Sequence, residues 1–324
     1  MAITLFTNSS AMSASNALQK ANSTLSSAME HLGTGKRINK ASDDAAGLQV
    51  ATRLQGQTNG MAVAQRNIAD ASTMLQTGEG AMDEVSNIMY RMKDLATQGA
   101  TDTNTADSRK AIDTELTSLN TELSSIMGNT SYAGNKLFSN TTTKDSTTGA
   151  TTTTATAKMG AAMTFQTGSE SGETTKVDVS SQLAKVFSSI NSLSTASVQD
   201  TAAVAGTAEV TDGKGTVTTP AVAGKDAVSG TTKANTLIDT LNTALDNVSS
   251  LRSSFGASIN GLSHASANLT NMKDNTDQAL GNIQDADFAS EASKMTRSQM
   301  LAQTSTSMLK QSNSMSSLVM SILG

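Results

Sequence analysis

Apolar side chains at helical heptad spacing occupy both ends of this 324-residue chain. This spacing places one apolar stripe along a single side of a helix, and such a stripe needs a partner to cover it. The two stripes therefore predict that the ends pair with each other, with other copies of the chain, or both, as in an assembling rod rather than an enzyme. The N-terminal stripe comprises Ala11, Ala14, Leu18, Ala21, Leu25, Ala28 and Leu32, and the C-terminal one has two neighbouring rows, Phe288, Met295, Ala302 and Leu309 beside Leu301, Met308, Met315 and Ile322.

The composition favours thin helical seams over a compact globular core. Aromatic residues make up only 2% of the chain, although large rings bury the most area per residue in ordinary cores. The net charge of −5 provides no basic field, so we expect neither nucleic acid nor an anionic membrane as a partner. Without cysteine, disulfides and thiolate metal ligands are excluded. We expect no secretory signal peptide in the opening segment and no apolar run long enough to span a membrane.

A long helical pattern follows the first stripe, with a row of apolar residues at strict seven-residue spacing, namely Leu54, Met61, Ile68, Leu75, Met82 and Met89. We expect this helix over residues 43–98, with the Ser42 hydroxyl capping its free N–H groups. Asp43 and Asp44 would then complement the positive end of the helix dipole.

Glycines inside the long pattern predict a weak point rather than a break, because Gly78 and Gly80 each cost about 1 kcal/mol relative to alanine. A third helix follows the turn at 99–104 and ends near Gly128. Helical periodicity returns over about 234–283 with matching period and comparable length. If this last helix pairs with the first long one, each covers the apolar stripe of the other. The chain would then run along a rod in one direction and return antiparallel to it.

The segments between the helices predict a small β region and two exposed loops. Residues 140–158 are rich in threonine and cannot bury enough surface to fold alone. Residues 163–179 have two β-prone arms around a Ser/Gly/Glu turn, which predicts a β-hairpin. Residues 195–232, with the single proline Pro220, predict a short surface insert with a few weak strands.

The expected fold is therefore mainly α, a long antiparallel coiled-coil rod with paired N- and C-terminal helices, a small β-hairpin region and a short variable outer insert. We assign residues 1–41 and 286–324 to the terminal helices. The rod domain is expected over 42–190 and 234–285, and the surface insert over 191–233.

Candidate chemistry is sparse, and the chain is not expected to be an enzyme or to hold a cofactor or metal. His31 and His264 are far apart in the sequence and most simply are helix residues. Asp43 and Asp44 could serve acid/base chemistry or a metal, but their position suits helix-dipole compensation better. The seventeen methionines occupy heptad positions and serve as adaptable packing residues rather than metal ligands. The threonine runs could accept O-linked sugar or form a solvated linker.

Four separated blocks resemble bacterial flagellin, in the family's order. The first is centred on the Leu-x-x-Gly-x-(Lys/Arg)-Ile-Asn-x-Ala-x-Asp-Asp-Ala-Ala-Gly motif. The similarity covers roughly 1–138, 159–190 and 234–324. The blocks are SASNALQKANSTLSSAMEHLGTGKRINKASDDAAGLQVATRL (13–54), SLNTELSSIMGNTSYAGNKLF (118–138), LRSSFGASINGLSHASANL (251–269) and NIQDADFASEASKMTRSQMLAQTSTSMLKQSN (282–313).

The resemblance implies a structural subunit of the extracellular flagellar filament. Such a subunit is exported unfolded by the flagellar type III apparatus, is held soluble by an export chaperone, and polymerises under a filament cap beyond the hook–filament junction protein. It also implies that the terminal helices form an inner tube and the rod domain an outer tube. The helix stripes then supply a polymerisation seam made of Leu18, Leu25, Leu32, Met295, Leu301, Met308, Leu309, Met315 and Ile322.

Flagellins also resemble one another in a surface that a vertebrate toll-like receptor senses. The matching positions are Arg91, Leu95 and Glu115, whereas Tyr90 departs from the glutamine often found there. The two charges could equally be an ordinary inter-helix or inter-subunit pair.

Two other functions fit parts of the sequence. A hook–filament junction protein resembles flagellin at both ends, but the strong C-terminal block favours flagellin. A flagellin-type protein with a protease in its insert would need a metal or nucleophile motif, and neither HExxH nor cysteine occurs.

Overall fold

The computed structural model describes residues 8–138, 157–194, 196–198 and 230–323, together with four short strands outside these ranges. Side chains are described within the four ranges as far as Ser314. The helices are α1 (Ser9–Thr34), α2 (Ala45–Gly99), α3 (Ala106–Asn129), α4 (Ser180–Ser194), α5 (Gly230–Gln284) and α6 (Phe288–Leu323), with a 3₁₀ turn η1 (Lys158–Gly160). The strands are β1 (Ser131–Tyr132), β2 (Asn135–Lys136), β3 (Thr141–Lys144), β4 (Thr151–Thr154), β5 (Met163–Gln166), β6 (Thr174–Val177), β7 (Val210–Thr211) and β8 (Val217–Thr219).

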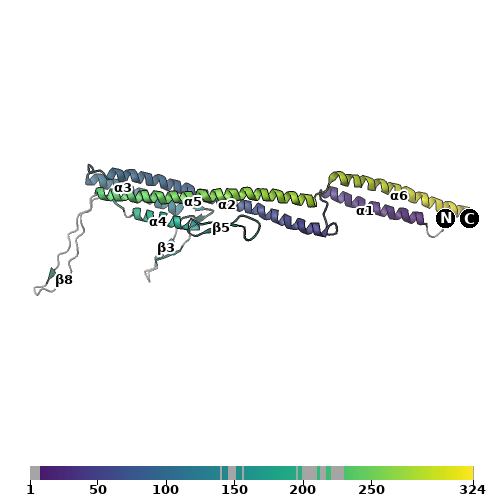
Figure 1. Ribbon diagram of the computed structural model, residues 1–324, viewed down its shortest axis with the longest axis horizontal. Helices are drawn as coiled ribbons and strands as arrows, with labels where there is room; N and C mark the ends of the chain where they lie inside the picture. The colour runs from purple at the N-terminus through teal and green to yellow at the C-terminus, as the bar shows by residue number, and fades with distance from the viewer. Residues whose placement is uncertain are drawn as a thin grey trace. The chain divides into compact units, whose positions relative to one another are not determined.

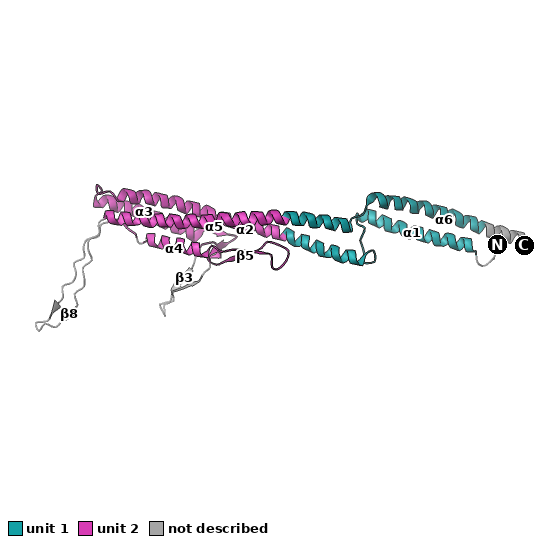
Figure 2. Cartoon of the chain, in the orientation of Figure 1, with its two compact units in different colours: residues 1–62, 270–324 teal, residues 63–269 magenta. Residues whose placement is uncertain are grey.

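The chain divides into two compact units, coloured separately in Figure 2. Unit 1 comprises residues 1–62 and 270–324, and unit 2 comprises residues 63–269. The long helices α2 and α5 each contribute residues to both units, so helical continuity does not mark the division.

In unit 1 the first and last helices pack against each other along a seam of small side chains (Figure 1). Ala14, Ala21 and Ala28 lie seven residues apart on α1 and are buried, with at most 5% of their surface exposed. The Asn8 side chain caps α1 by accepting from Ser10 and Ala11, and its amide donates to the Ser312 hydroxyl at 2.8 Å. The predicted pairing of the N- and C-terminal helices is therefore confirmed.

The two connections at the end of this helix pair are hydrogen-bonded to each other. Gly35 ends α1 with φ at 70°, a left-handed conformation that favours glycine. Its carbonyl accepts from the Ala286 amide at 3.0 Å, and the Arg37 amide donates to the Gln284 carbonyl at 2.7 Å. The Arg37 guanidinium adds a bond to the Ile283 carbonyl at 2.8 Å. These bonds satisfy backbone groups that the helix ends would otherwise leave unpaired.

The start of α2 corrects one detail of the sequence prediction. The helix begins at Ala45, and the cap is Asp44, whose carboxylate accepts from the Gly47 amide at 2.8 Å. Asp43 instead accepts from the Asn39 and Lys40 amides of the connection. Ser42 was the wrong cap because both carboxylates compete for nearby N–H groups, and each is a stronger acceptor than a hydroxyl.

The core of unit 2 is assembled from rows of apolar residues on several helices. On α2 the seven-residue row Ile68, Leu75, Met82 and Met89 is buried, as the periodicity predicted. Ion pairs tie its outer faces together, with Arg252 of α5 2.9 Å from Asp83 and Arg91 2.7 Å from Glu115 of α3. The remaining core comes mainly from α3, α4 and α5, through Ile112, Leu116, Leu123, Met127, Leu183, Val186, Ile190, Leu237, Leu241, Val248, Leu251, Phe255, Leu262 and Leu269.

The predicted hairpin is confirmed by the antiparallel pair β5–β6, in which Met163 lies opposite Val177. Sequence reasoning missed the smaller β1–β2 hairpin, whose turn residues Ala133 and Gly134 both have positive φ. Only the glycine signals such a turn, because alanine rarely adopts this conformation. The strands β3 and β4 pair within the threonine-rich segment, and β7 and β8 pair within the predicted insert. Most of the insert lies outside the described residues.

The expected fold class is confirmed, with helices predominating and a small antiparallel β region between α3 and α4 in the chain. Gly78 and Gly80 do not interrupt α2. Gly78 is buried, and a Cβ there would lie 3.1 Å from Met159 Cε and 3.4 Å from Phe138 Cζ. The absence of a side chain at Gly78 therefore lets Met159 and Phe138 pack directly against α2.

We predict opposite effects from enlarging the two α2 glycines. Gly78→Leu should destabilise unit 2 by about 1–3 kcal/mol, because the added side chain must displace Met159 and Phe138. Gly80→Leu should stabilise by up to about 1 kcal/mol, since nothing lies near its Cβ and leucine is the better helix former. Urea denaturation followed by circular dichroism measures the free energy of unfolding of both variants. Equal effects would contradict the close packing of Met159 and Phe138 against Gly78.

Candidate assembly surface

Large apolar side chains remain exposed on the α1–α6 pair of unit 1. Six of the ten strongly exposed large apolar side chains among the described residues belong to these two helices. Full burial of such a side chain is worth roughly 1.5–3 kcal/mol, and about half of that remains to be gained at each, so a further partner would stabilise the pair. The six are Met12, Met29, Phe288, Met300, Leu301 and Met308, each more than half exposed.

The structure places the expected seam residues in three environments. Leu18, Leu25 and Leu32 of α1 are half-buried, as are Met295 and Leu309 of α6. Leu301 and Met308 are exposed, at 52% and 58%. The side chains of Met315 and Ile322 lie outside the described residues, although α6 continues through both positions.

Sequence reasoning missed the most buried row of α6, because that row is polar. Glu291, Ser298 and Ser305 lie seven residues apart and are each at most 6% exposed. Ala21 of α1 lines the same groove as Ser298 and Ser305. Small side chains on both helices let the backbones approach closely. The only sequence signal was the seven-residue spacing of these serines, which has little contrast in a serine-rich chain.

Glu291 anchors one end of this seam electrostatically. Its Oε1 lies 2.8 Å from Lys294 Nζ on the same helix and 3.5 Å from His31 Nδ1 on α1. The Lys294 hydrogen bond holds the pKa of the Glu291 carboxyl below its ordinary value, against the opposing effect of burial, and His31 assists. The carboxylate therefore pairs chiefly within α6, and it pairs with α1 only when the His31 imidazole is protonated.

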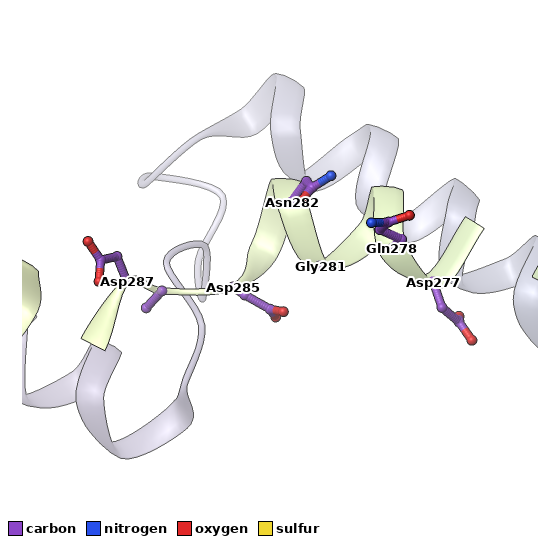
Figure 3. A pocket seen from close by; sticks show the side chains of 7 residues that line it. Asp277, Gln278, Gly281, Asn282, Asp285 and Asp287 are labelled. Atoms are coloured by element: carbon purple, nitrogen blue, oxygen red, sulfur yellow. The ribbon is translucent and has the colours of Figure 1, made fainter. Parts of the chain in front are cut away.

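Acidic side chains surround the connection between α5 and α6 in unit 1 (Figure 3). A shallow hollow there is lined by Asp277, Asp285 and Asp287 together with polar neighbours. In Figure 3 the three carboxylates project in different directions rather than toward one point. In keeping with this, no group of three His, Asp or Glu side chains within the described ranges could hold a metal ion.

The remaining candidate residues have structural positions. Asp43 and Asp44 accept backbone hydrogen bonds at the start of α2, and His264 is exposed on α5. Of the helices in the described ranges, none combines the length and apolar character needed to cross a bilayer.

The residues matched to the receptor surface differ in exposure in the structure. Arg91 donates through Nε and Nη2 to one oxygen of Glu115, at 3.1 and 2.7 Å, and both side chains are about half exposed. Leu95 is only 3% exposed, which corrects the expectation that it forms part of an outer face. It lies one helical turn after Arg91 on the side of α2 that packs into the core. Tyr90 is exposed beside the ion pair at 56%.

Paired helices with an uncovered apolar surface are typical of a structural protein rather than an enzyme. The comparisons with known proteins agree. Residues 5–143 match the bacterial flagellin N-terminal helical region, and residues 238–323 match the bacterial flagellin C-terminal helical region. The chain belongs to the bacterial flagellin family.

Full-length relatives support the same assignment. The chain is 34% identical to polar flagellin F of Vibrio parahaemolyticus and 35% identical to flagellin A of Vibrio anguillarum, in each case over all of both chains. A solved structure of a proposed flagellar hook-associated protein from Vibrio parahaemolyticus shares the fold, with a TM-score of 0.50 at 19% identity over 75% of this chain and all of that one. The chain is therefore a structural subunit of the extracellular flagellar filament and not an enzyme.

We predict that acid destabilises unit 1 through Glu291, chiefly by breaking its pair with Lys294 on α6. Because the folded-state pKa is lowered, the stabilisation is present above the ordinary carboxyl pKa and is lost as pH falls through the folded value. Glu291→Gln should therefore flatten the loss of thermal stability between about pH 6 and pH 3. Circular dichroism melts measure this, with exposed Glu122→Gln on α3 as control. A variant as acid-sensitive as the wild type would argue against this role of Glu291.

Proposed function

We propose that the α1–α6 pair lines the inner tube of the filament and provides its polymerisation seam. The inner tube would comprise residues 1–41 and 286–324, and the outer tube residues 42–190 and 234–285, with 191–233 as a surface insert. The observation that carries this proposal is the concentration of exposed apolar side chains on α1 and α6. The connections over residues 35–44 and 285–287 contain the proposed boundaries, which supports the division, whereas the two compact units divide within α2 and α5.

Neighbouring copies would supply most of the stabilisation of this pair. The seam within one copy buries alanine and serine, which contribute little apolar area. Ordering the helices costs about 1–2 kcal/mol per residue in backbone entropy, so the larger side chains must also be buried. The proposed seam residues Leu18, Leu25, Leu32, Met295, Leu301, Met308, Leu309, Met315 and Ile322 would meet other copies in this way.

The family also suggests how the subunit reaches the filament. We propose export in an unfolded state by the flagellar type III apparatus, with a chaperone covering the C-terminal helix and a cap protein guiding assembly. Hook-associated proteins, including the hook–filament junction protein, would be its neighbours at the filament base. The likeness to a proposed hook-associated structure concerns the fold alone, while the full-length relatives are flagellins, so the filament subunit is preferred to the junction protein.

We predict that Leu301→Ala combined with Met308→Ala weakens polymerisation without unfolding unit 2. Both side chains are exposed in one copy, so their loss costs little there. Where neighbours bury them, each truncation costs about 2–5 kcal/mol. Sedimentation of polymer and negative-stain electron microscopy measure the effect.

A matched control for this experiment truncates polar side chains on another face of the same helix. Gln299→Ala combined with Gln303→Ala should assemble like the wild type, since both residues are exposed and polar. Filaments of normal length from the Leu301/Met308 variant would count against the proposed seam.

We further propose that the Arg91–Glu115 pair contributes to a surface sensed by a vertebrate toll-like receptor. The support is the half-exposed ion pair on adjacent helices, with Tyr90 open to solvent beside it. Leu95 would act only from beneath, by fixing α2 in the core. A second possibility is that the pair serves only to join α2 and α3.

We predict that Arg91→Glu reduces receptor activation by at least about tenfold. The change removes the basic group and places a second carboxylate beside Glu115. A receptor-reporter cell assay with purified monomer measures this. Arg66→Glu, at an exposed position on the same helix, should leave activation unchanged. Equal activation by wild type and Arg91→Glu, with both folded by circular dichroism, would assign the pair to helix joining alone.

A further inference from the structure

A groove between α1 and α6 gathers positive charge in unit 1. Lys20, Lys294 and Arg297 lie along it, and it encloses about 380 Å³. Lys294 is paired with Glu291, but Lys20 and Arg297 form no ion pair with any described residue. Both are exposed, and the half-exposed side chain of Leu301 lines the same groove. The groove therefore offers two uncompensated cations beside an apolar contact.

The complementary groups lie at the start of α6. Asp285 is exposed, and no described side chain forms an ion pair with its carboxylate. Asp287 accepts from the Ala289 amide at 3.1 Å and so caps α6 while remaining exposed. Phe288, the next residue, is 63% exposed. Figure 3 shows Asp285 and Asp287 projecting from the chain around this connection. The patch thus combines acidic charge with one exposed ring.

One copy cannot bring these two surfaces together. Arg297 is the tenth residue of the continuous helix α6, about 15 Å along the axis from the start of the helix, and Asp285 lies before that start. A neighbouring copy, displaced along this axis, can present its acidic patch to the groove. The acidic patch and the basic groove are both present on every copy.

We propose that the start of α6 in one copy, through Asp285 and Phe288, docks into the Lys20–Arg297–Leu301 groove of the next copy. The inference rests on the proposed inner-tube function and identifies one contact within it. The occupant is a second copy of this chain because it matches the groove in both charge and apolar character. Since the two surfaces differ, the contact is heterologous and leaves one surface free at each end, which gives an open series rather than a closed dimer. The charges set the register and orientation of the docked copy.

A charge swap tests the contact. Arg297→Glu and Asp285→Arg should each raise the critical concentration for assembly on sheared wild-type filament seeds by about tenfold, as for the loss of an interfacial ion pair. Combining both changes in one chain should return the critical concentration to within about threefold of the wild type, because the pair is restored with reversed signs. Asp287 is left intact because it caps α6.

Lys310→Glu is the matched control, because Lys310 is an exposed cation on the same helix outside the groove and should leave the critical concentration unchanged. Circular dichroism confirms that each variant folds. If Arg297→Glu assembles like the wild type, or the double variant is no better than the single ones, the groove contact is overturned. If instead the Leu301→Ala, Met308→Ala double variant assembles on the same seeds like the wild type, the proposed assembly surface fails as a whole.

Discussion

The close pairing of α1 and α6 through small side chains is the interaction on which unit 1 depends. Ala14, Ala21 and Ala28 give α1 a flat buried edge, and the serines at 298 and 305 give α6 another. A seam of this kind can bring two helices close together but removes little apolar surface from water. The large side chains are consequently displaced to the flanks and outer faces of the pair. The same choice of residues that permits close pairing leaves large apolar side chains uncovered within one chain.

Polar interactions at the ends of the pair compensate for the weakness of its seam. At one end the Asn8 amide reaches Ser312, and at the other Glu291 links Lys294 and His31. Beyond Glu291, the backbone bonds between residues 35–37 and 284–286 hold the two connections side by side. These directional bonds fix the alignment of the helices, while the apolar flanks remain available. Polar groups therefore align the two helices, whereas apolar side chains supply the burial. Within one chain the alignment is complete, but the burial of the large apolar side chains is not.

The helical part of the fold could be predicted because its signal is periodic. The α2 row from Ile68 to Met89 is buried as the spacing required, and the paired terminal helices follow from uncovered stripes at both ends. The polar row at Glu291, Ser298 and Ser305 could not be found in this way, because hydrophobic periodicity does not register small or charged residues. Leu95 was wrongly expected on an outer face for a different reason. The resemblance identified a position in a surface segment, but only the packing of α2 shows which side of the helix that position occupies. The turn at Ala133 was missed because its conformation is unusual for alanine.

The distribution of charge can specify the orientation in which two copies associate, which the apolar surface alone cannot. Exposed methionines are adaptable and could pack in several registers, so they favour association without specifying its geometry. In unit 1 the acidic residues gather at the start of α6, and the unpaired Arg297 lies two to three turns further along that helix, in a groove shared with Lys20 of α1. Two copies aligned without displacement would place like charges together, whereas an axial shift of about 15 Å brings opposite charges into contact. A staggered, head-to-tail arrangement is thus favoured over a symmetric dimer, and that preference is what an open filament requires.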